Sequence, residues 1–315
     1  VMSLRSWIND LLKGAALSVL FEICLVSLVY ALLAWQPQFW WLWVAIILLF
    51  FSVVMANLAP VLIFPLFYKF KPLSEGELTR RLLALADKAR TRVRGVYTMQ
   101  MSNRTTATNA ALMGLGNTRR IVVGDTMIDR YTPDEIEVVL AHELGHHVHG
   151  DIWRLITGES IITLCGLYLG SLILHWVVGT QHYYQALTDP ATMLFFALLA
   201  GIFGLIILPI NNLNSRACEN NADEYALQVT GKVETFKTVM IHLANQNLAE
   251  LDPSPIIEFL FYSHPSVSKR LAHADKFAAL HHDRAALSSA NLEPTSSTEP
   301  SGMESSGSST PDAAH

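Results

Sequence analysis

The chain has 315 residues, of which 51% are hydrophobic and only 16% are charged, whereas a typical soluble domain is about 25% charged. This balance argues against a soluble protein and indicates a membrane protein. The net charge is −5, and no cluster of lysine and arginine is interleaved with aromatic residues, so nucleic acid is not an expected partner. The three cysteines lie far apart, which predicts neither a disulfide framework nor a cysteine-based zinc cluster.

Four apolar segments are long enough to cross a bilayer, for which a helix needs about 20 apolar residues. Lysine and arginine are absent from Gly14–Tyr68 and from Leu155–Ser215. Short or charge-poor loops join the segments in pairs, so we predict two transmembrane hairpins, within residues 1–68 and 155–210. The predicted spans cover roughly residues 15–35, 40–64, 160–178 and 193–210.

The basic residues predict which side of the membrane each loop occupies. Arg5 and Lys13 precede the first span, and segment 69–154 is rich in lysine and arginine. The positive-inside rule therefore places these segments, and everything after residue 211, in the cytoplasm. The opening residues VMSLRSW do not form a signal peptide, and we expect the true N-terminus to lie upstream.

Segment 69–154 is predicted to form a small cytoplasmic layer of helices and strands. Ser74–Thr91 has leucines on one face and basic residues on the other, which is typical of an amphipathic packing helix. Three short runs with strand composition follow, and together they predict a small sheet. These runs are Val96–Met101, Asn109–Leu112 and Arg120–Val123.

A helix is predicted to begin at Thr132, because threonine followed by proline and by Glu135 is a capping-box pattern. The helix should continue to about His149, where Gly150 can end it. Residues 211–282 are expected to form further cytoplasmic helices. Residues 283–315 are rich in Ser, Pro, Thr and Gly with few apolar residues, so we expect a disordered tail.

The predicted helix contains His142-Glu143-Leu144-Gly145-His146, an H-E-x-x-H pattern. Histidines four apart lie on one helical face, so His142 and His146 can bind one zinc ion. Glu143 points away from the ion but is close enough to take a proton from the water that zinc activates, which is the role of a general base.

A catalytic zinc usually has three protein ligands, so a third ligand should lie downstream. Our candidate is Glu219, nine residues past the fourth span; for this residue alone, a solvated carboxylate on a helix surface is the competing interpretation. Asp223 lies one turn further along the same predicted helix and could orient a ligand histidine. The site is predicted to lie close to the membrane surface, where a membrane-spanning or lipid-attached substrate would reach it.

Five motifs in order resemble the type I CAAX prenyl endopeptidases, which are integral-membrane zinc proteases. The resemblance covers roughly residues 11–275 and is far more specific than H-E-x-x-H alone. The motifs are Pro65–Phe67 with Lys69–Phe70 and Pro72–Leu73; Thr108–Ala110 with Gly114 and Gly116; His142–His146; Ser215–Arg216 with Glu219 and Asp223; and Phe261–Pro265 with Ser268–Arg270.

The resemblance implies a zinc ion held by His142, His146 and Glu219, with Glu143 as the base. It also implies that Asp223 and Arg270 support the site and that His264 assists at the substrate, although the sequence around His264 by itself indicates only a solvated turn. Asn109 and Ala110, on the predicted edge strand, would pair with an extended substrate, and Arg270 is counted with these substrate-side residues. The family's chamber is walled by seven helices, whereas this sequence predicts four.

These observations predict a mainly helical, multi-span membrane protein with a small cytoplasmic α+β catalytic layer of the gluzincin type. The predicted function is a zinc-dependent endopeptidase acting on membrane-associated peptides or proteins, including prenylated CAAX-type substrates. One alternative is a heat-shock-type membrane quality-control zinc protease. An alternative of another class is a non-catalytic zinc-binding membrane scaffold, against which the intact Glu143 argues, because a scaffold needs the histidines but not the base.

Overall fold

The computed structural model describes residues 4–114, 116–181 and 186–290. The chain divides into two units, residues 1–277 and 278–315, and the site described below lies in the first. Helix α11 (Val267–Ala290) continues past the tail boundary predicted at residue 283, because the segment DRAALSSA that follows contains strong helix formers. The remainder of the predicted tail, 291–315, lies outside the described residues.

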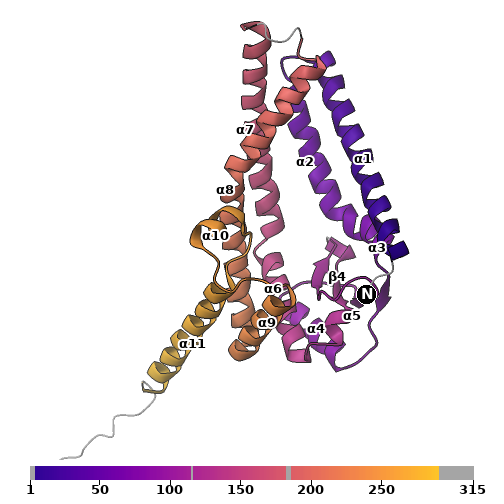
Figure 1. Ribbon diagram of the computed structural model, residues 1–315. Coiled ribbons are helices and arrows are strands. Elements are labelled where there is room, and N and C mark those ends of the chain that lie inside the picture. Colours follow the sequence, from indigo (N-terminus) through magenta and orange to yellow (C-terminus); the bar gives the residue numbers. More distant parts are fainter. Residues whose placement is uncertain (1–3, 115, 182–185, 291–315) are drawn as a thin grey trace, which may run out of the picture. The chain divides into compact units, whose positions relative to one another are not determined.

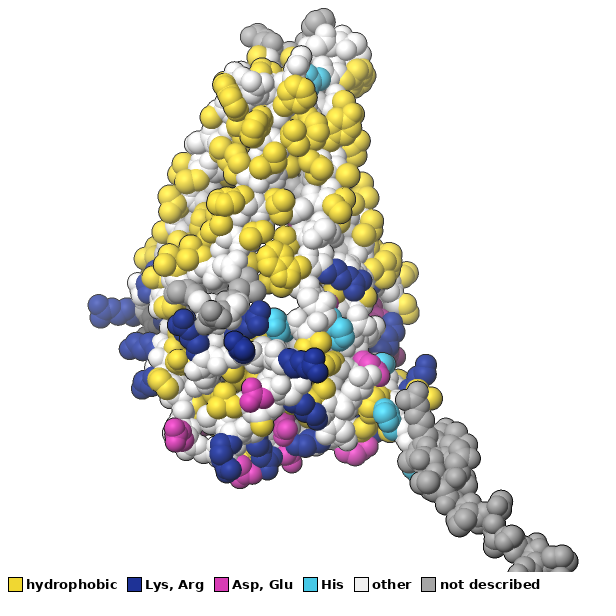
Figure 2. All heavy atoms as spheres, turned by 180° about the vertical axis from the view of Figure 1, so that it is seen from behind, with side chains coloured by type: hydrophobic (Ala, Val, Ile, Leu, Met, Phe, Trp, Pro, Cys, Tyr) yellow, Lys and Arg dark blue, Asp and Glu magenta, His cyan; other side chains and the backbone are white. Residues whose placement is uncertain are grey.

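Four described helices are long and apolar enough to cross a membrane. Large apolar side chains on these helices face outward, such as Phe50 at 69% exposed. Figure 2 shows hydrophobic side chains covering the long helices, while charged side chains gather at the end that holds the sheet. This distribution confirms the prediction of a multi-span membrane protein. The four helices are α1 (Leu4–Trp35), α2 (Trp40–Leu58), α7 (Asp151–Gly179) and α8 (Pro190–Thr230).

The helices extend further than the predicted spans. Helix α8 has 41 residues, about 60 Å at 1.5 Å per residue, which is twice the hydrocarbon thickness of about 30 Å. Its C-terminal half therefore projects out of the bilayer, and the fourth span and the predicted Glu219 helix are one continuous element (Figure 1). Helix α2 ends before the predicted residue 64, in a π turn (Ala59–Ile63) that leads into α3 (Phe64–Phe67).

A four-stranded sheet lies beyond the ends of the membrane helices, in the order β1-β2-β4-β3. Strands β2 and β4 are parallel, and β3 pairs with β4 antiparallel, so β3 is an edge strand. The three predicted strands are present, whereas β1 was not predicted because it is short and contains Pro72. The strands are β1 (Phe70–Pro72), β2 (Val96–Met99), β3 (Ala110–Met113) and β4 (Arg120–Gly124).

Helices α4 (Glu77–Lys88) and α6 (Pro133–Val148) pack on the sheet, and α9 (Val233–Gln246) packs on α6. Together they enclose the main hydrophobic core. The amphipathic helix predicted at 74–91 corresponds to α4. Helix α6 lies at the centre of this arrangement and contacts α4, α8, α9 and β3. It is preceded by the short helix α5 (Asp125–Ile128).

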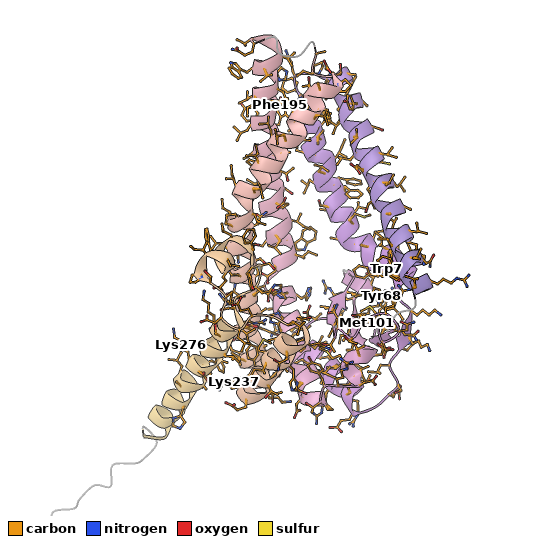
Figure 3. All side chains as sticks on the ribbon, in the orientation of Figure 1. Trp7, Tyr68, Met101, Phe195, Lys237 and Lys276 are labelled. Carbon is orange, nitrogen blue, oxygen red and sulfur yellow. The ribbon has the colours of Figure 1, made fainter. Side chains whose placement is uncertain are left out.

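The N-terminal part of α1 is fastened to the loop that precedes β3. Arg104 of this loop forms an ion pair with Asp10 of α1. Met101, at the start of the same loop, is buried in a small core against which Tyr68 packs (Figure 3). The edge strand is thereby joined to a membrane helix as well as to the sheet.

Candidate metal centre and active site

The start of α6 fixes the helix that carries both histidines. The Thr132 hydroxyl accepts from the backbone N–H of Glu135 at 3.3 Å, and the Glu135 carboxylate accepts from the N–H of Thr132 at 2.8 Å, which is the predicted capping box. Leu140 and Leu144 face the core and are fully buried. The opposite face of α6 is thus left to present His142 and His146 to the site.

A close contact between α6 and α8 brings the third candidate ligand to this face. A Cβ atom at Gly145 would lie 2.9 Å from the Cα of Ala222 on α8, closer than side chains normally approach. The two backbones therefore touch, as only glycine permits. Glu219 stands one turn before Ala222 on α8, and this contact places its carboxylate over the two imidazoles.

The three predicted ligands converge. The Nε2 atoms of His142 and His146 are 3.2 Å apart, and each lies 3.4 Å from an oxygen of Glu219. All three candidate ligand atoms lie within 4.8 Å of one another. The two contacts with Glu219 are longer than ordinary hydrogen bonds, and the buried Oε2 atom of Glu219 has no hydrogen-bond partner. An unpaired buried carboxylate oxygen facing two imidazole nitrogens fits a bound metal cation.

A carboxylate behind each imidazole orients it. Asp223 Oδ1 lies 2.8 Å from His142 Nδ1, and Asp151 Oδ2 lies 2.8 Å from His146 Nδ1. Such contacts fix the Nδ1–H tautomer and turn each Nε2 toward the ion. The role of Asp223 as an orienting group was predicted; Asp151 was missed. The sequence feature that could have indicated Asp151 is Gly150. Its φ of +68° turns the chain back, so that Asp151 begins α7 beside the helix that has just ended.

The electrostatics of this cluster favour positive charge. Burial by itself lowers the pKa of His142, but the hydrogen bond with Asp223 and the nearby carboxylate of Glu219 outweigh it and raise the pKa to about 9. Desolvation raises the pKa of Glu143, which keeps this carboxyl group basic enough to accept a proton. The two carboxylates that stabilise a proton on the imidazole also stabilise a metal ion in its place.

Arg270 lies next to the cluster and pairs with Asp223. Its Nε donates to Asp223 Oδ2 at 2.7 Å and its Nη2 to Asp223 Oδ1 at 2.5 Å. This bidentate pair uses the Nε/Nη2 edge of the guanidinium, so Arg270 positions Asp223, which in turn orients His142. This contact fits the supporting role that the resemblance implied for Arg270, and because its side chain also borders the cavity described next, the substrate-side assignment stays a prediction.

A cavity of about 400 Å³ opens between the metal cluster and the edge strand. Asn109 and Ala110 lie on one side of it, and Glu143 lies beside the cluster. Strand β3 has a sheet partner on one side only, β4, although the Asn109 carbonyl already accepts from Gly124 N–H at 2.7 Å. The cavity thus combines a strand edge able to pair with an extended peptide, a carboxylate base and a cluster suited to a metal.

His264 stands at the mouth of the same cavity. Its Nε2 lies 3.3 Å from Glu219 Oε1, and its side chain is 61% exposed. The turn that carries it follows α10 (Pro255–Phe261). Glu258 of α10 stabilises this turn, since its carboxylate accepts from the N–H of Ser266 at 3.0 Å. Arg216 of α8 also stabilises it by donating to the carbonyls of Glu258 and Tyr262. Sequence reasoning missed the role of Glu258.

Comparisons with known proteins agree with this geometry. Residues 72–278 match the profile of Peptidase family M48. The chain belongs to this family. Residues 1–69 match a second profile, described as the CAAX prenyl protease N-terminal domain with five membrane helices. In the part of residues 1–69 that the structure describes, by contrast, two helices are candidate membrane spans. The resemblance drawn from the five motifs is confirmed.

Several known proteins are similar over most of this chain. An uncharacterised metalloprotease of Bacillus subtilis, YhfN, is 30% identical over 275 residues, covering 86% of this chain and 64% of the relative. CAAX prenyl protease 1 of Saccharomyces cerevisiae is 28% identical over 295 residues, covering 87% of this chain and 64% of the relative. The crystal structure of S. mikatae Ste24p superposes with a TM-score of 0.78 at 26% identity, covering 87% of this chain and 67% of that one. The chain therefore spans slightly under two thirds of the curated relatives' length.

Proposed function

We propose that this M48 chain is a zinc-dependent endopeptidase that cleaves membrane-associated peptides and proteins, including prenylated CAAX-type substrates. The observation that carries the proposal is the convergence of His142, His146 and Glu219 beside the half-buried Glu143, in a cavity bordered by an edge strand. In this proposal the three residues hold zinc. Zinc in such a site polarises the scissile carbonyl and lowers the pKa of water from about 15.7 towards about 7.

The remaining residues act on the peptide. An extended substrate lies against Asn109 and Ala110, which sets its carbonyl over the cluster. Glu143 accepts a proton from the attacking water and returns it to the leaving amine. His264, exposed at the cavity mouth, donates to the oxygen on which negative charge develops. The positive-inside distribution of lysine and arginine supports a cytoplasmic position for this site.

The test is cleavage of a farnesylated CAAX peptide and its unprenylated twin by purified protein in detergent. Each peptide is assayed with zinc, with a chelator, and with Glu143→Gln. We expect the wild-type protein to cut the prenylated peptide and the chelator to stop this cutting. Glu143→Gln should retain its zinc and cut roughly 10²–10⁴-fold more slowly. Equal cutting of both peptides would limit the proposal to a membrane protease of broader specificity. Cutting by Glu143→Gln at the wild-type rate would contradict the mechanism.

A further inference from the structure

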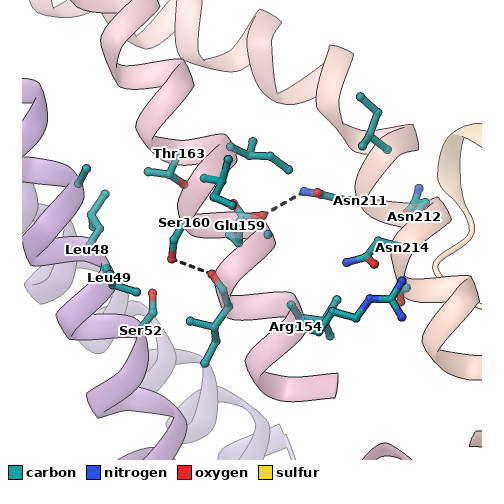
Figure 4. Close-up of a pocket in the computed structure, with 18 residues that line it drawn as sticks. Leu48, Leu49, Ser52, Arg154, Glu159, Ser160, Thr163, Asn211, Asn212 and Asn214 are labelled. Atoms are coloured by element: carbon teal, nitrogen blue, oxygen red, sulfur yellow. Dashed lines mark hydrogen bonds between the residues drawn. The ribbon is translucent and has the colours of Figure 1, made fainter. Parts of the chain in front are cut away.

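The cavity at the metal cluster has two borders that lie far apart in the sequence. Asn109 and Ala110 line it at the start of β3, and Ala244 and Asn247 line it from the C-terminal end of α9. A larger cavity, of about 770 Å³, lies between α2, α7 and α8 (Figure 4) and shares no lining residue with it. A peptide at the metal cluster therefore lies against β3 and the end of α9.

Beside the cavity, the backbone groups that β3 can offer to a peptide belong to Ala110. Residues of an antiparallel strand alternate between bonding to the neighbouring strand and pointing away from it. The Asn109 carbonyl accepts from the N–H of Gly124 at 2.7 Å. Because the register pairs Ala110 with Val123, the N–H and carbonyl of Ala110 point to the open edge. The place of Ala110 relative to the metal cluster thus decides how an extended peptide is presented.

The segment 105–109, which leads into β3, has no helix or strand of its own. Two of its carbonyls accept hydrogen bonds from side chains in and just after α5. Oγ1 of Thr126 donates to the Ala107 carbonyl at 2.7 Å, and Nη1 of Arg130 donates to the Thr106 carbonyl at 3.0 Å. The path of this segment is therefore set by side chains rather than by a sheet ladder.

Gln246, the last residue of α9, binds the same segment with both ends of its side-chain amide. Its Nε2 donates to the Thr106 carbonyl at 2.6 Å, and its Oε1 accepts from Oγ1 of Thr108 at 2.5 Å. Helix α9 packs on α6, the helix that carries both histidines of the metal cluster. Gln246 thereby connects the metal-binding helix to the segment that leads into the edge strand.

We infer that Gln246 is a positioning residue, which holds the backbone of Ala110 at the place where a peptide pairs with it beside the metal cluster. The inference rests on the proposed function, because it concerns how the same cavity receives its peptide. A glutamine that only stabilised the fold would affect every substrate alike. A glutamine that positions the strand affects the hydrogen bond between the peptide and Ala110, and it leaves the zinc ligands in place because they belong to α6 and α8.

The experiment compares one peptide with a series of its depsipeptides, in each of which one backbone N–H outside the scissile bond is replaced by an ester oxygen. In the wild type, the ester that faces the Ala110 carbonyl should be cut roughly 2–12-fold more slowly in kcat/KM than the parent peptide, the effect of one lost hydrogen bond. In Gln246→Ala the parent peptide should lose a similar factor, mainly through a higher KM, and the same ester should lose little more.

Two further variants calibrate this comparison. Gln246→Glu keeps the acceptor for Thr108 but not the donor to the Thr106 carbonyl, so it should retain part of the ester effect. Gln228→Ala is the matched control, because Gln228 is exposed on α8 and pairs only with Glu224 of the same helix among the described residues. It should show the full wild-type ester effect. Zinc affinity and thermal unfolding should be unchanged in Gln246→Ala.

No ester effect at any position in the wild type, or an equal effect in Gln246→Ala, would overturn the inference. So would a loss of zinc affinity or thermal stability in Gln246→Ala that slows all peptides alike. Hydrogen exchange tests the residue without cleavage: the amides of residues 105–110 should exchange faster in Gln246→Ala than in Gln228→Ala, and equal exchange would also overturn the inference. Failure of the proposed function gives a different result, namely no zinc-dependent cutting of any peptide by the wild type.

Discussion

Replacing Gly145 with alanine tests how the two ligand helices are held together. An added Cβ would lie 2.9 Å from Ala222 Cα, 3.1 Å from Ala222 O and 3.2 Å from Tyr225 Cβ. Two of these neighbours belong to the backbone of α8, so no side-chain rotation relieves the contact. Helices α6 and α8 must move apart, and they carry the two halves of the proposed ligand set.

The size of the displacement follows from these distances. Carbon atoms in contact normally lie about 3.5–4.0 Å apart, so the helices must separate by roughly 0.6–1.1 Å. Zinc–ligand distances tolerate only about 0.2 Å, and a misplacement of about 1 Å can reduce the rate about 100-fold. Overpacking lowers the free energy of unfolding by about 1–3 kcal/mol, whereas the higher helix propensity of alanine over glycine raises it by about 1 kcal/mol. Gly145→Ala should therefore remain largely folded and lose zinc affinity and activity much more than stability.

The assay measures zinc affinity by competition with a chromophoric chelator, together with thermal unfolding and peptide cleavage. Gly201→Ala is the matched control, because Gly201 lies in α8 and an added Cβ there meets nothing within 4 Å. We expect at least a tenfold loss of zinc affinity in Gly145→Ala and wild-type behaviour in Gly201→Ala. Wild-type zinc affinity and cleavage in Gly145→Ala would refute the argument that this contact sets the ligand geometry.

Three further changes test other parts of the site. Asp223→Asn should lower zinc affinity about 10–100-fold, measured by the same competition, because the carboxylate that orients His142 loses its charge; unchanged affinity would show that the contact is not used. Glu258→Ala should leave zinc content intact but lower kcat/KM, because it frees the turn that carries His264; a loss of zinc instead would contradict that assignment. Removal of residues 283–315 should leave peptide cleavage nearly unchanged, since every proposed site residue precedes them, and a large loss of activity would refute this prediction.

Local sequence patterns were sufficient for much of the fold. The absence of lysine and arginine over long segments predicted the membrane helices, because a charge in hydrocarbon is costly whatever the surrounding fold. The Thr132–Glu135 pattern predicted the start of α6, because a capping box is satisfied within one turn. The boundaries were less accurate: α8 runs on to Thr230, continuing through Pro209 at the end of the predicted fourth span. Strand β1 was missed because so short a strand depends on its neighbour β2.

The sequence by itself determined the chemical character of the site. Histidines four apart on a helix face one another in any fold, and Glu143 between them is fixed by the same helical period. The tertiary structure decided what completes the site, because Glu219, Asp151 and Arg270 come from elements whose approach depends on packing. The contact of Gly145 with α8 sets the place of Glu219, and the turn at Gly150 sets that of Asp151. Distances between such elements are not encoded in any local pattern, so only the folded chain shows that Arg270 pairs with Asp223.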